Sequence, residues 1–181
     1  MYQDLIESLI PIGSRSYWFF LALLLLARAA DFISTWVATP NLVLEGNPIA
    51  KMLGWRLGIA LNLMMCATFA AWPLSAITIA TTSSLVAARN FQSAWLMRTL
   101  GEEGYRDWYV ERLQQTSLPL YLFCLGGHVL LTAGIGAGLM FFYGGSLVPL
   151  AIGVGFLGYA VAVTGFTLLS IWRIRGLRGY S

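Results

Sequence analysis

The chain reads as long apolar runs separated by short polar segments. A helix that crosses ~30 Å of hydrocarbon needs about 20 predominantly apolar residues. Four runs are this long, at about residues 17–39, 57–80, 118–142 and 147–172. Backbone groups inside a bilayer must form hydrogen bonds within their own segment, so each run is predicted to be a helix. The pattern therefore predicts an all-α, polytopic integral membrane protein with four transmembrane helices, short interfacial helices and a single domain.

The composition supports this class. Hydrophobic residues make up 58% of the chain and charged residues only 10%, whereas a soluble domain carries about 25% charged residues. Cys66 and Cys124 both lie inside apolar runs and are expected to be packing residues. The segment before the first run carries Asp4 and Glu7 with only Arg15, which does not match a signal peptide. The first run is therefore predicted to be a membrane helix.

The connections between the runs have distinct characters. Pro73 lies inside the second predicted span and is expected to kink it. Residues 143–146 form a short connection, which predicts an antiparallel hairpin of the last two spans. Residues 85–116 are both charged and aromatic, so they are predicted to form interfacial helices or a solvated connector. Basic and acidic residues balance there, which favours neither an anionic-lipid patch nor nucleic-acid binding.

Lysine and arginine near the span ends predict the orientation, because cytoplasmic loops are enriched in both. Most arginines precede the first predicted span, lie in the 85–116 segment or follow the last span. Both termini and the 85–116 segment are therefore predicted to be cytoplasmic. The 40–55 loop, which contains only Lys51 and is followed by Arg56, is predicted to face outward.

Charged residues inside the first span are the main candidates for a functional site. Arg28 lies ~16 Å into this span at ~1.5 Å per residue, which is close to the bilayer midplane. Asp31 and Thr35 follow at the next turns on the same helix face. Each such ion costs about 2.5–3.5 kcal/mol at a helix centre, so both are expected to have polar partners.

Four further polar residues fall near this depth or close to the end of the first span. Asn62 lies in the second span and His128 near the middle of the third. Glu45 and Asn47 lie in the outer loop, where Asn47 followed by Pro48 is typical of a helix N-terminus. If the spans form one bundle, Arg28, Asp31, Thr35, Glu45, Asn47, Asn62 and His128 are predicted to form a polar cluster in its outer half.

The Asp31-x3-Thr35 pair followed by Glu45-x-Asn47-Pro48 resembles the motif of an uncharacterised family of small multi-span bacterial and archaeal membrane proteins. In that family a first-span aspartate and threonine precede a Glu-x-Asn-Pro turn. The resemblance covers roughly residues 27–65. Because the activity of the family is not established, the resemblance implies a membrane architecture, in a bacterial or archaeal cytoplasmic membrane, and no reaction.

Small residues recur along the last two spans and predict close helix packing. The stripe comprises Gly134 and Gly138 in the third span and Ala151, Gly155, Gly158, Ala162 and Gly165 in the fourth. Its partner is left open between another helix of this chain, a second copy and another membrane protein. The lipid bilayer is the one partner that the composition itself predicts.

Three functions remain open from the sequence. The first is an accessory, scaffold or assembly subunit in which the polar residues only stabilise the fold. The second is ion, proton or solute binding and transport by an oligomer, with Asp31 and His128 as a proton relay. The third is a hydrolase acting on a lipid-linked substrate, with a metal held by Asp31, Glu45 and His128. The sequence specifies no catalytic residue and no cofactor.

Overall fold

The computed structural model describes residues 9–176, and this part of the chain is helical apart from its connections. The helices are α2 (Arg15–Ala38), α3 (Pro48–Phe69), α4 (Pro73–Leu100), α5 (Glu102–Gln115), α6 (Leu118–Phe141) and α7 (Leu147–Gly176). Four of them, α2, α3, α6 and α7, are long and apolar enough to cross a membrane. The predicted fold class is therefore confirmed.

The second predicted span, at 57–80, does not form one helix. Helix α3 ends at Phe69, and α4 begins at Pro73 after a short turn. Proline lacks the backbone N–H that a helix interior requires but fits the first turn of a helix, where that N–H would have no partner. Pro73 therefore starts a new helix and does not kink an existing one. Helix α4 then continues to Leu100 and includes the first half of the predicted 85–116 segment. The second half of that segment forms α5.

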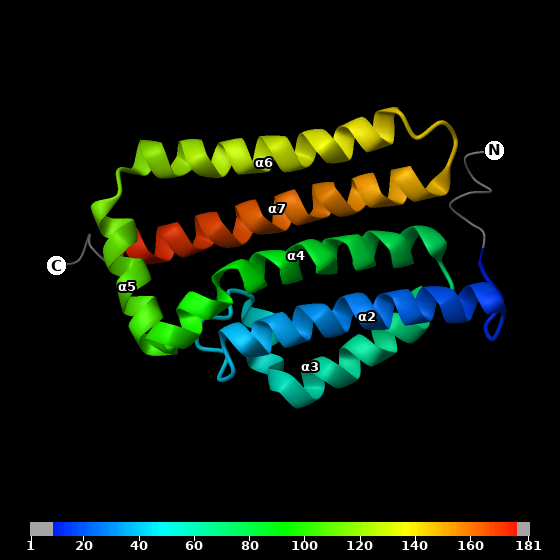
Figure 1. Cartoon of the computed structure of the whole chain (residues 1–181), viewed down its shortest axis with the longest axis horizontal. Helices are drawn as coiled ribbons and strands as arrows, with labels where there is room; N and C mark the ends of the chain where they lie inside the picture. The colour runs from blue at the N-terminus through cyan, green and yellow to red at the C-terminus, as the bar shows by residue number, and fades with distance from the viewer. Residues whose placement is uncertain (1–8, 177–181) are drawn as a thin grey trace.

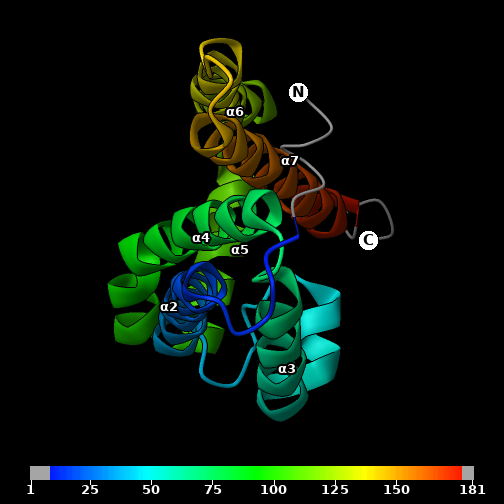
Figure 2. The same ribbon diagram turned by 90° about the vertical axis from the view of Figure 1, so that its right-hand side faces the viewer.

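Helix α4 lies at the centre of the bundle. It packs against α2 on one side and α7 on the other, with α3 beyond α2 and α6 beyond α7 (Figures 1 and 2). Its buried face consists mostly of small residues, namely Ala76, Ala80, Ser83, Ala87 and Ala94. Small side chains at spacings of three and four allow neighbouring helices to approach closely. Helix α4 is thus covered by the membrane-length helices around it.

Helices α2, α4 and α7 run in the same direction, and α3 and α6 return between them (Figure 1). Thr78 and Thr82 on α4 donate hydrogen bonds from their hydroxyl groups to the carbonyl oxygens of Ala151 and Gly155 on α7, at 3.1 and 3.0 Å. A Cβ atom at Gly155 would lie only 2.7 Å from the Thr81 side chain. Gly155 therefore allows α7 to contact α4.

The predicted glycine stripes are confirmed only in part. Gly155 packs within this chain, and so does Gly136 on α6, which faces Gly153 on α7. The last two spans form the expected hairpin through this contact. A Cβ atom at Gly134, Gly138 or Gly165 would meet nothing within 4 Å among the described residues.

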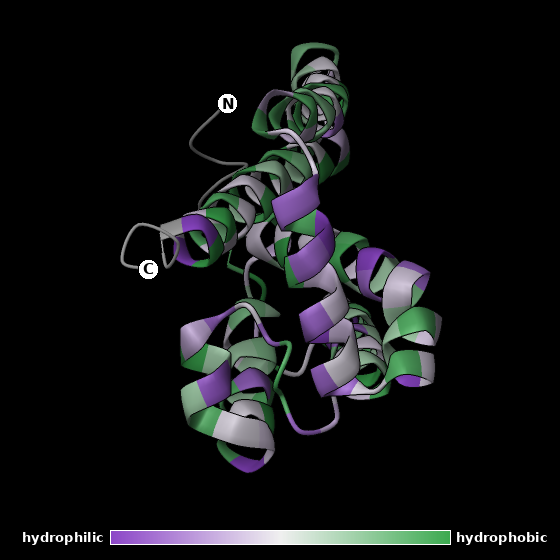
Figure 3. Ribbon diagram, turned by 90° about the vertical axis from the view of Figure 1, so that its left-hand side faces the viewer, coloured by the Kyte–Doolittle hydropathy of each residue, from purple (hydrophilic) through white to green (hydrophobic). Residues whose placement is uncertain are grey.

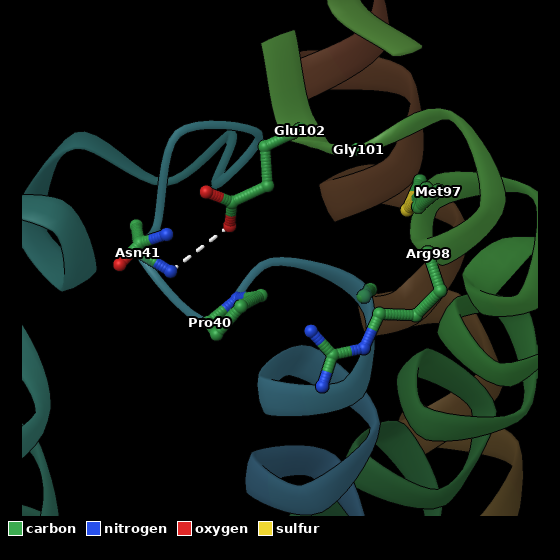
Figure 4. Close-up of a pocket in the computed structure, with 7 residues that line it drawn as sticks. Pro40, Asn41, Met97, Arg98, Gly101 and Glu102 are labelled. Atoms are coloured by element: carbon green, nitrogen blue, oxygen red, sulfur yellow. Dashed lines mark hydrogen bonds between the residues drawn. The ribbon is translucent and has the colours of Figure 1, made fainter. Parts of the chain in front are cut away.

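The connections at one end of the bundle lie closer together than the sequence predicted. The Glu102 carboxylate on α5 accepts hydrogen bonds from the Thr39 hydroxyl at 2.7 Å and the Asn41 backbone N–H at 2.9 Å. Figure 4 shows Glu102 reaching across to Asn41. The 40–55 loop and α5 therefore meet at the same end of the bundle, whereas the sequence predicted opposite sides of the membrane. The start of α2 and the end of α7 lie at opposite ends of the bundle (Figure 1), because α4 adds a further passage.

Candidate functional site

The polar residues of the first span meet groups from two other helices. The Arg28 guanidinium on α2 donates to the Asp31 carboxylate at 2.7 Å, to the Asn62 side-chain oxygen on α3 at 2.7 Å and to the Ser83 hydroxyl on α4 at 3.0 Å. It also lies over the Phe32 ring, 5.6 Å from the ring centroid. We call Arg28, Asp31, Asn62 and Ser83 the Arg28 network.

A second polar contact lies about two turns further along α2. The Asn90 side-chain nitrogen on α4 is 3.2 Å from the Thr35 hydroxyl and 3.4 Å from the Ser34 hydroxyl. Ser34 is fully buried, and its hydroxyl donates to the Asp31 carbonyl oxygen at 2.8 Å. Thr35 therefore contributes to the α2–α4 interface and does not contact Arg28.

The Arg28 network is mostly shielded from its surroundings. The side chains of Arg28 and Asp31 are 22% and 16% exposed, respectively. Asn62 additionally donates to the Gly58 carbonyl oxygen at 2.8 Å, which orients its oxygen toward Arg28. Buried charges are tolerated when they are paired and hydrogen-bonded, and three helices supply these partners here.

Glu45 and Asn47 organise the loop before α3. The Asn47 side-chain oxygen accepts the backbone N–H of Ile49 at 3.0 Å, which confirms Asn47 as the helix N-cap. Glu45 accepts the backbone N–H of Asn47 at 2.8 Å. No hydrogen bond joins Glu45 to Asp31 among the described residues. Asn47 and Glu45 are therefore loop-forming residues.

His128 does not join the Arg28 network. It lies in a cleft on the other side of α4, where α4, α6 and α7 meet. Its ring packs edge-on against Tyr159 of α7, with 6.1 Å between the ring centroids. The predicted convergence is therefore wrong for His128, because α6 packs against α7 on the side of α4 that faces away from the Arg28 network.

The cleft has a volume of about 610 Å³ and is lined by both polar and apolar side chains. Its polar residues are Arg89, Gln92, Tyr121, His128, Thr132, Tyr159 and Thr167. Arg89 is exposed, lies beside the Tyr159 hydroxyl, and has no carboxylate within 4 Å in the part of the chain that the structure describes. We call this feature the Arg89 cleft.

A pair of tyrosines links α5 to the Arg89 cleft. The hydroxyl groups of Tyr109 on α5 and Tyr121 on α6 are 3.0 Å apart. Burial, together with this hydrogen bond, raises the pKa of Tyr109 well above its usual range. Tyr109 is therefore a neutral hydroxyl group in this contact, as an unperturbed tyrosine also is at physiological pH.

The geometry does not support the predicted metal site. Among residues 9–176, no group of three or more His, Cys, Asp or Glu side chains could hold a metal ion. Asp31 and Glu45 lie on the α2–α3 side of α4, and His128 lies in the Arg89 cleft. The three proposed ligands therefore do not form one site.

Sequence reasoning missed Ser83, Asn90 and Arg89 as site residues because the second span was predicted to end at residue 80 and residues 85–116 were predicted to be cytoplasmic. The signal was present in the spacing of Ala76, Ala80, Ser83, Ala87, Asn90 and Ala94. These positions follow a three-and-four period of small residues, which indicates a tightly packed helix.

Comparisons with protein-family models, with curated proteins and with solved structures found no match to this chain.

Proposed function

We propose that the chain is a non-catalytic integral membrane protein that serves as an accessory, scaffold or assembly subunit. The observation that carries this proposal is the Arg28 network, in which α2, α3 and α4 supply the hydrogen-bond partners of the guanidinium. A polar centre completed by the protein itself stabilises one arrangement of helices. Such a preassembled unit suits a protein whose role is to present its helices to a partner.

The geometry lends less support to the other two functions. A proton relay from Asp31 to His128 would have to pass α4, which separates the Arg28 network from the Arg89 cleft. A hydrolase that uses Asp31, Glu45 and His128 as metal ligands meets the same obstacle.

We place the protein in a bacterial or archaeal cytoplasmic membrane, with the α5 end of the bundle in the cytoplasm. Hydrophilic residues gather at this end (Figure 3). Its basic residues are Lys51, Arg56, Arg98, Arg106, Arg112, Arg173 and Arg175, whereas Arg15 lies at the opposite end. The excess of lysine and arginine favours this orientation.

The orientation is tested by thiol labelling in intact cells after Cys66 and Cys124 are replaced by Ala. Gln115→Cys at the α5 end should react with a membrane-impermeant reagent only after the cells are lysed. Ser146→Cys in the α6–α7 turn should react in intact cells. The reverse pattern would overturn the orientation.

The scaffold proposal is tested with the double variant Arg28→Met/Asp31→Leu, which replaces both charges by apolar side chains. Native electrophoresis of gently solubilised membranes should show the parent chain in an assembly larger than the monomer, and the double variant in the same assembly. The proposal would be contradicted if the parent chain migrates as a monomer. It would also be contradicted by solute flux in proteoliposomes that Asp31→Asn abolishes.

A further inference from the structure

We propose that the Arg89 cleft binds an anionic acyl lipid, with the lipid head group at Arg89 and its chain along α6 and α7. This inference concerns a ligand and is independent of the scaffold role. It starts from a difference between two arginines on opposite sides of α4. Arg28 has a carboxylate at 2.7 Å, whereas no described carboxylate lies within 4 Å of Arg89.

The depth of Arg89 makes its missing counter-charge costly. Arg89 lies at the level of Tyr159 and His128, and His128 is ~15 Å from the start of α6 at ~1.5 Å per residue. Both α6 and α7 are long and apolar enough to cross a membrane. A cation near the middle of such helices costs about 2.5–3.5 kcal/mol unless it has polar or anionic partners. An anionic ligand would supply the missing charge.

Neighbouring side chains suit an anionic oxygen group. Gln92 and Tyr121 line the cleft on the α5 side of Arg89, and His128 and Tyr159 line it at the same level. Their amide, hydroxyl and imidazole N–H groups can donate hydrogen bonds to a carboxylate or phosphate. Arginine forms charge-assisted hydrogen bonds with both of these groups.

The rest of the cleft suits an acyl chain. Leu131, Ile135 and Phe156 line it beyond His128 and present only apolar surface. Beyond the level of His128 the lining continues along α6 to Ile135, which is ~10 Å, so it covers part of an acyl chain and the remainder extends into the hydrocarbon leaflet, which is ~15 Å thick. Its volume of about 610 Å³ lies within the usual range of ligand sites, ~300–1,000 Å³. Because α6 and α7 form two of its walls, a ligand enters sideways from the bilayer.

The experiment measures displacement of a fluorescent polyene fatty acid from the full chain in nanodiscs of phosphatidylcholine. Oleate and phosphatidylglycerol carry an anionic group, whereas oleyl alcohol has an uncharged head and additional phosphatidylcholine has no net charge. We expect an anionic lipid to displace the probe at a concentration about tenfold lower than either of these controls. Displacement by oleate alone identifies a free fatty acid as the ligand. Displacement by phosphatidylglycerol extends the site to phospholipids.

Variants assign the effect to the cleft. Arg89→Gln should weaken binding of the anionic lipid about tenfold, to the level of the neutral controls. Arg98→Gln is the matched control, since Arg98 lies on the same helix but faces the Trp36 ring, outside the cleft. Ala88→Phe keeps Arg89 and fills the cleft, so it should abolish binding even if Arg89→Gln folds poorly.

Three results would overturn the proposal. The first is equal displacement by charged and neutral lipids. The second is unchanged lipid binding in Arg89→Gln and Ala88→Phe variants that melt like the parent. The third is displacement of the probe by inorganic phosphate alone, which would identify a small-anion site without a place for an acyl chain.

Discussion

Two arginines on opposite sides of α4 face different surroundings. Arg28 is bound by Asp31, Asn62 and Ser83, which come from three helices. Arg89 is exposed in a cleft of about 610 Å³, lies beside the Tyr159 hydroxyl and has no carboxylate within 4 Å among the described residues. The protein therefore contains one arginine whose charge is balanced internally and one whose charge is open to a ligand.

This difference separates stability from binding. An ion pair inside a bundle holds its helices together, and removing one partner leaves an unbalanced charge. An arginine at an open cleft contributes little to folding and can interact with what enters the cleft. Substitutions at the two arginines should therefore have opposite profiles, with a large stability change at Arg28 and a large binding change at Arg89.

The largest effect is expected from Asp31→Leu, which leaves Arg28 without a counter-charge. We expect a loss of about 3 kcal/mol in the free energy of unfolding, because a buried cation loses its partner. Unfolding in mixed micelles with increasing denaturing detergent measures this loss. The double variant Arg28→Met/Asp31→Leu should recover most of it, since neither charge remains.

Arg89→Met is the control for this comparison. It should not lower the unfolding free energy by more than about 0.5 kcal/mol in lipid-free detergent, because it breaks no ion pair and removes a cation that has no described counter-charge. If Asp31→Leu and Arg89→Met destabilise the protein equally, the distinction between a balanced and an open arginine is wrong.

Much of the fold could be predicted from the sequence because bilayer length imposes strong limits on apolar helices. The bounds of the first span and of the last two spans were predicted to within a few residues of α2, α6 and α7. The contact of Arg28 with Asp31 follows from their spacing on one helix face. Asn62 was expected near them from depth alone. Its hydrogen bond with Arg28 confirms that depth is informative when the two helices are neighbours.

The rest depended on information that a single sequence lacks. Pro73 suits both a kinked helix and a new helix, and only the packing of the following residues decides between them. That choice determined the position of α4 and hence the orientation of the chain. His128 was misplaced for a different reason. Depth does not specify rotation about a helix, and α4 lies between His128 and Asp31.

The next largest effect is expected where α7 forms a wall of the Arg89 cleft. Gly155→Ala would place a Cβ atom 2.7 Å from the Thr81 side chain and 3.0 Å from the Thr78 carbonyl oxygen. We expect a destabilisation of about 1–3 kcal/mol, because α7 must move away from α4. The melting temperature in detergent measures this change.

The matched control is Gly165→Ala on the same helix, where a Cβ atom would meet nothing within 4 Å among the described residues. It should leave the melting temperature unchanged or raise it slightly. Gly155→Ala should also weaken lipid binding while the Arg28 network stays intact. Equal melting temperatures for the two variants would show that close α4–α7 contact does not support the cleft.

A smaller effect is expected from Ser83→Ala, which removes one of the three hydrogen bonds of Arg28. Polar contacts between membrane helices contribute about 0.6 kcal/mol on average, so the unfolding free energy should fall by about this amount. Ser84→Ala is the control, because Ser84 is exposed whereas Ser83 is buried. A loss as large as that of Asp31→Leu would mean that Ser83, and not the counter-charge, determines the stability of the network.

The smallest effect is expected at Glu102, which lies outside both regions and joins the α2–α3 loop to α5. Partial burial acts against ionisation, but hydrogen bonds from Thr39 and Asn41 and the positive charge of Arg98 outweigh it and hold the Glu102 pKa below its usual value. A lowered carboxylate pKa stabilises the folded state above the unfolded value of about 4.3, and this stability is lost as the pH falls through the folded value. Because Glu102 is largely exposed, we expect less than about 1 kcal/mol.

The Trp55 indole provides a local signal for this change, since its N–H donates to the Pro40 carbonyl oxygen at 2.8 Å. Its indole N–H proton resonance in a selectively labelled sample should shift as the pH falls through the lowered pKa of Glu102, because protonated Glu102 no longer accepts two hydrogen bonds as an anion. Glu102→Gln should show the shifted resonance already at neutral pH, whereas Glu103→Gln should behave like the parent, because Glu103 pairs only with Arg106 on the surface of α5. A Trp55 resonance that is independent of both pH and Glu102 would show that α3 alone positions the loop. The contact between the α2–α3 loop and α5 would then not support the proposed orientation of the chain.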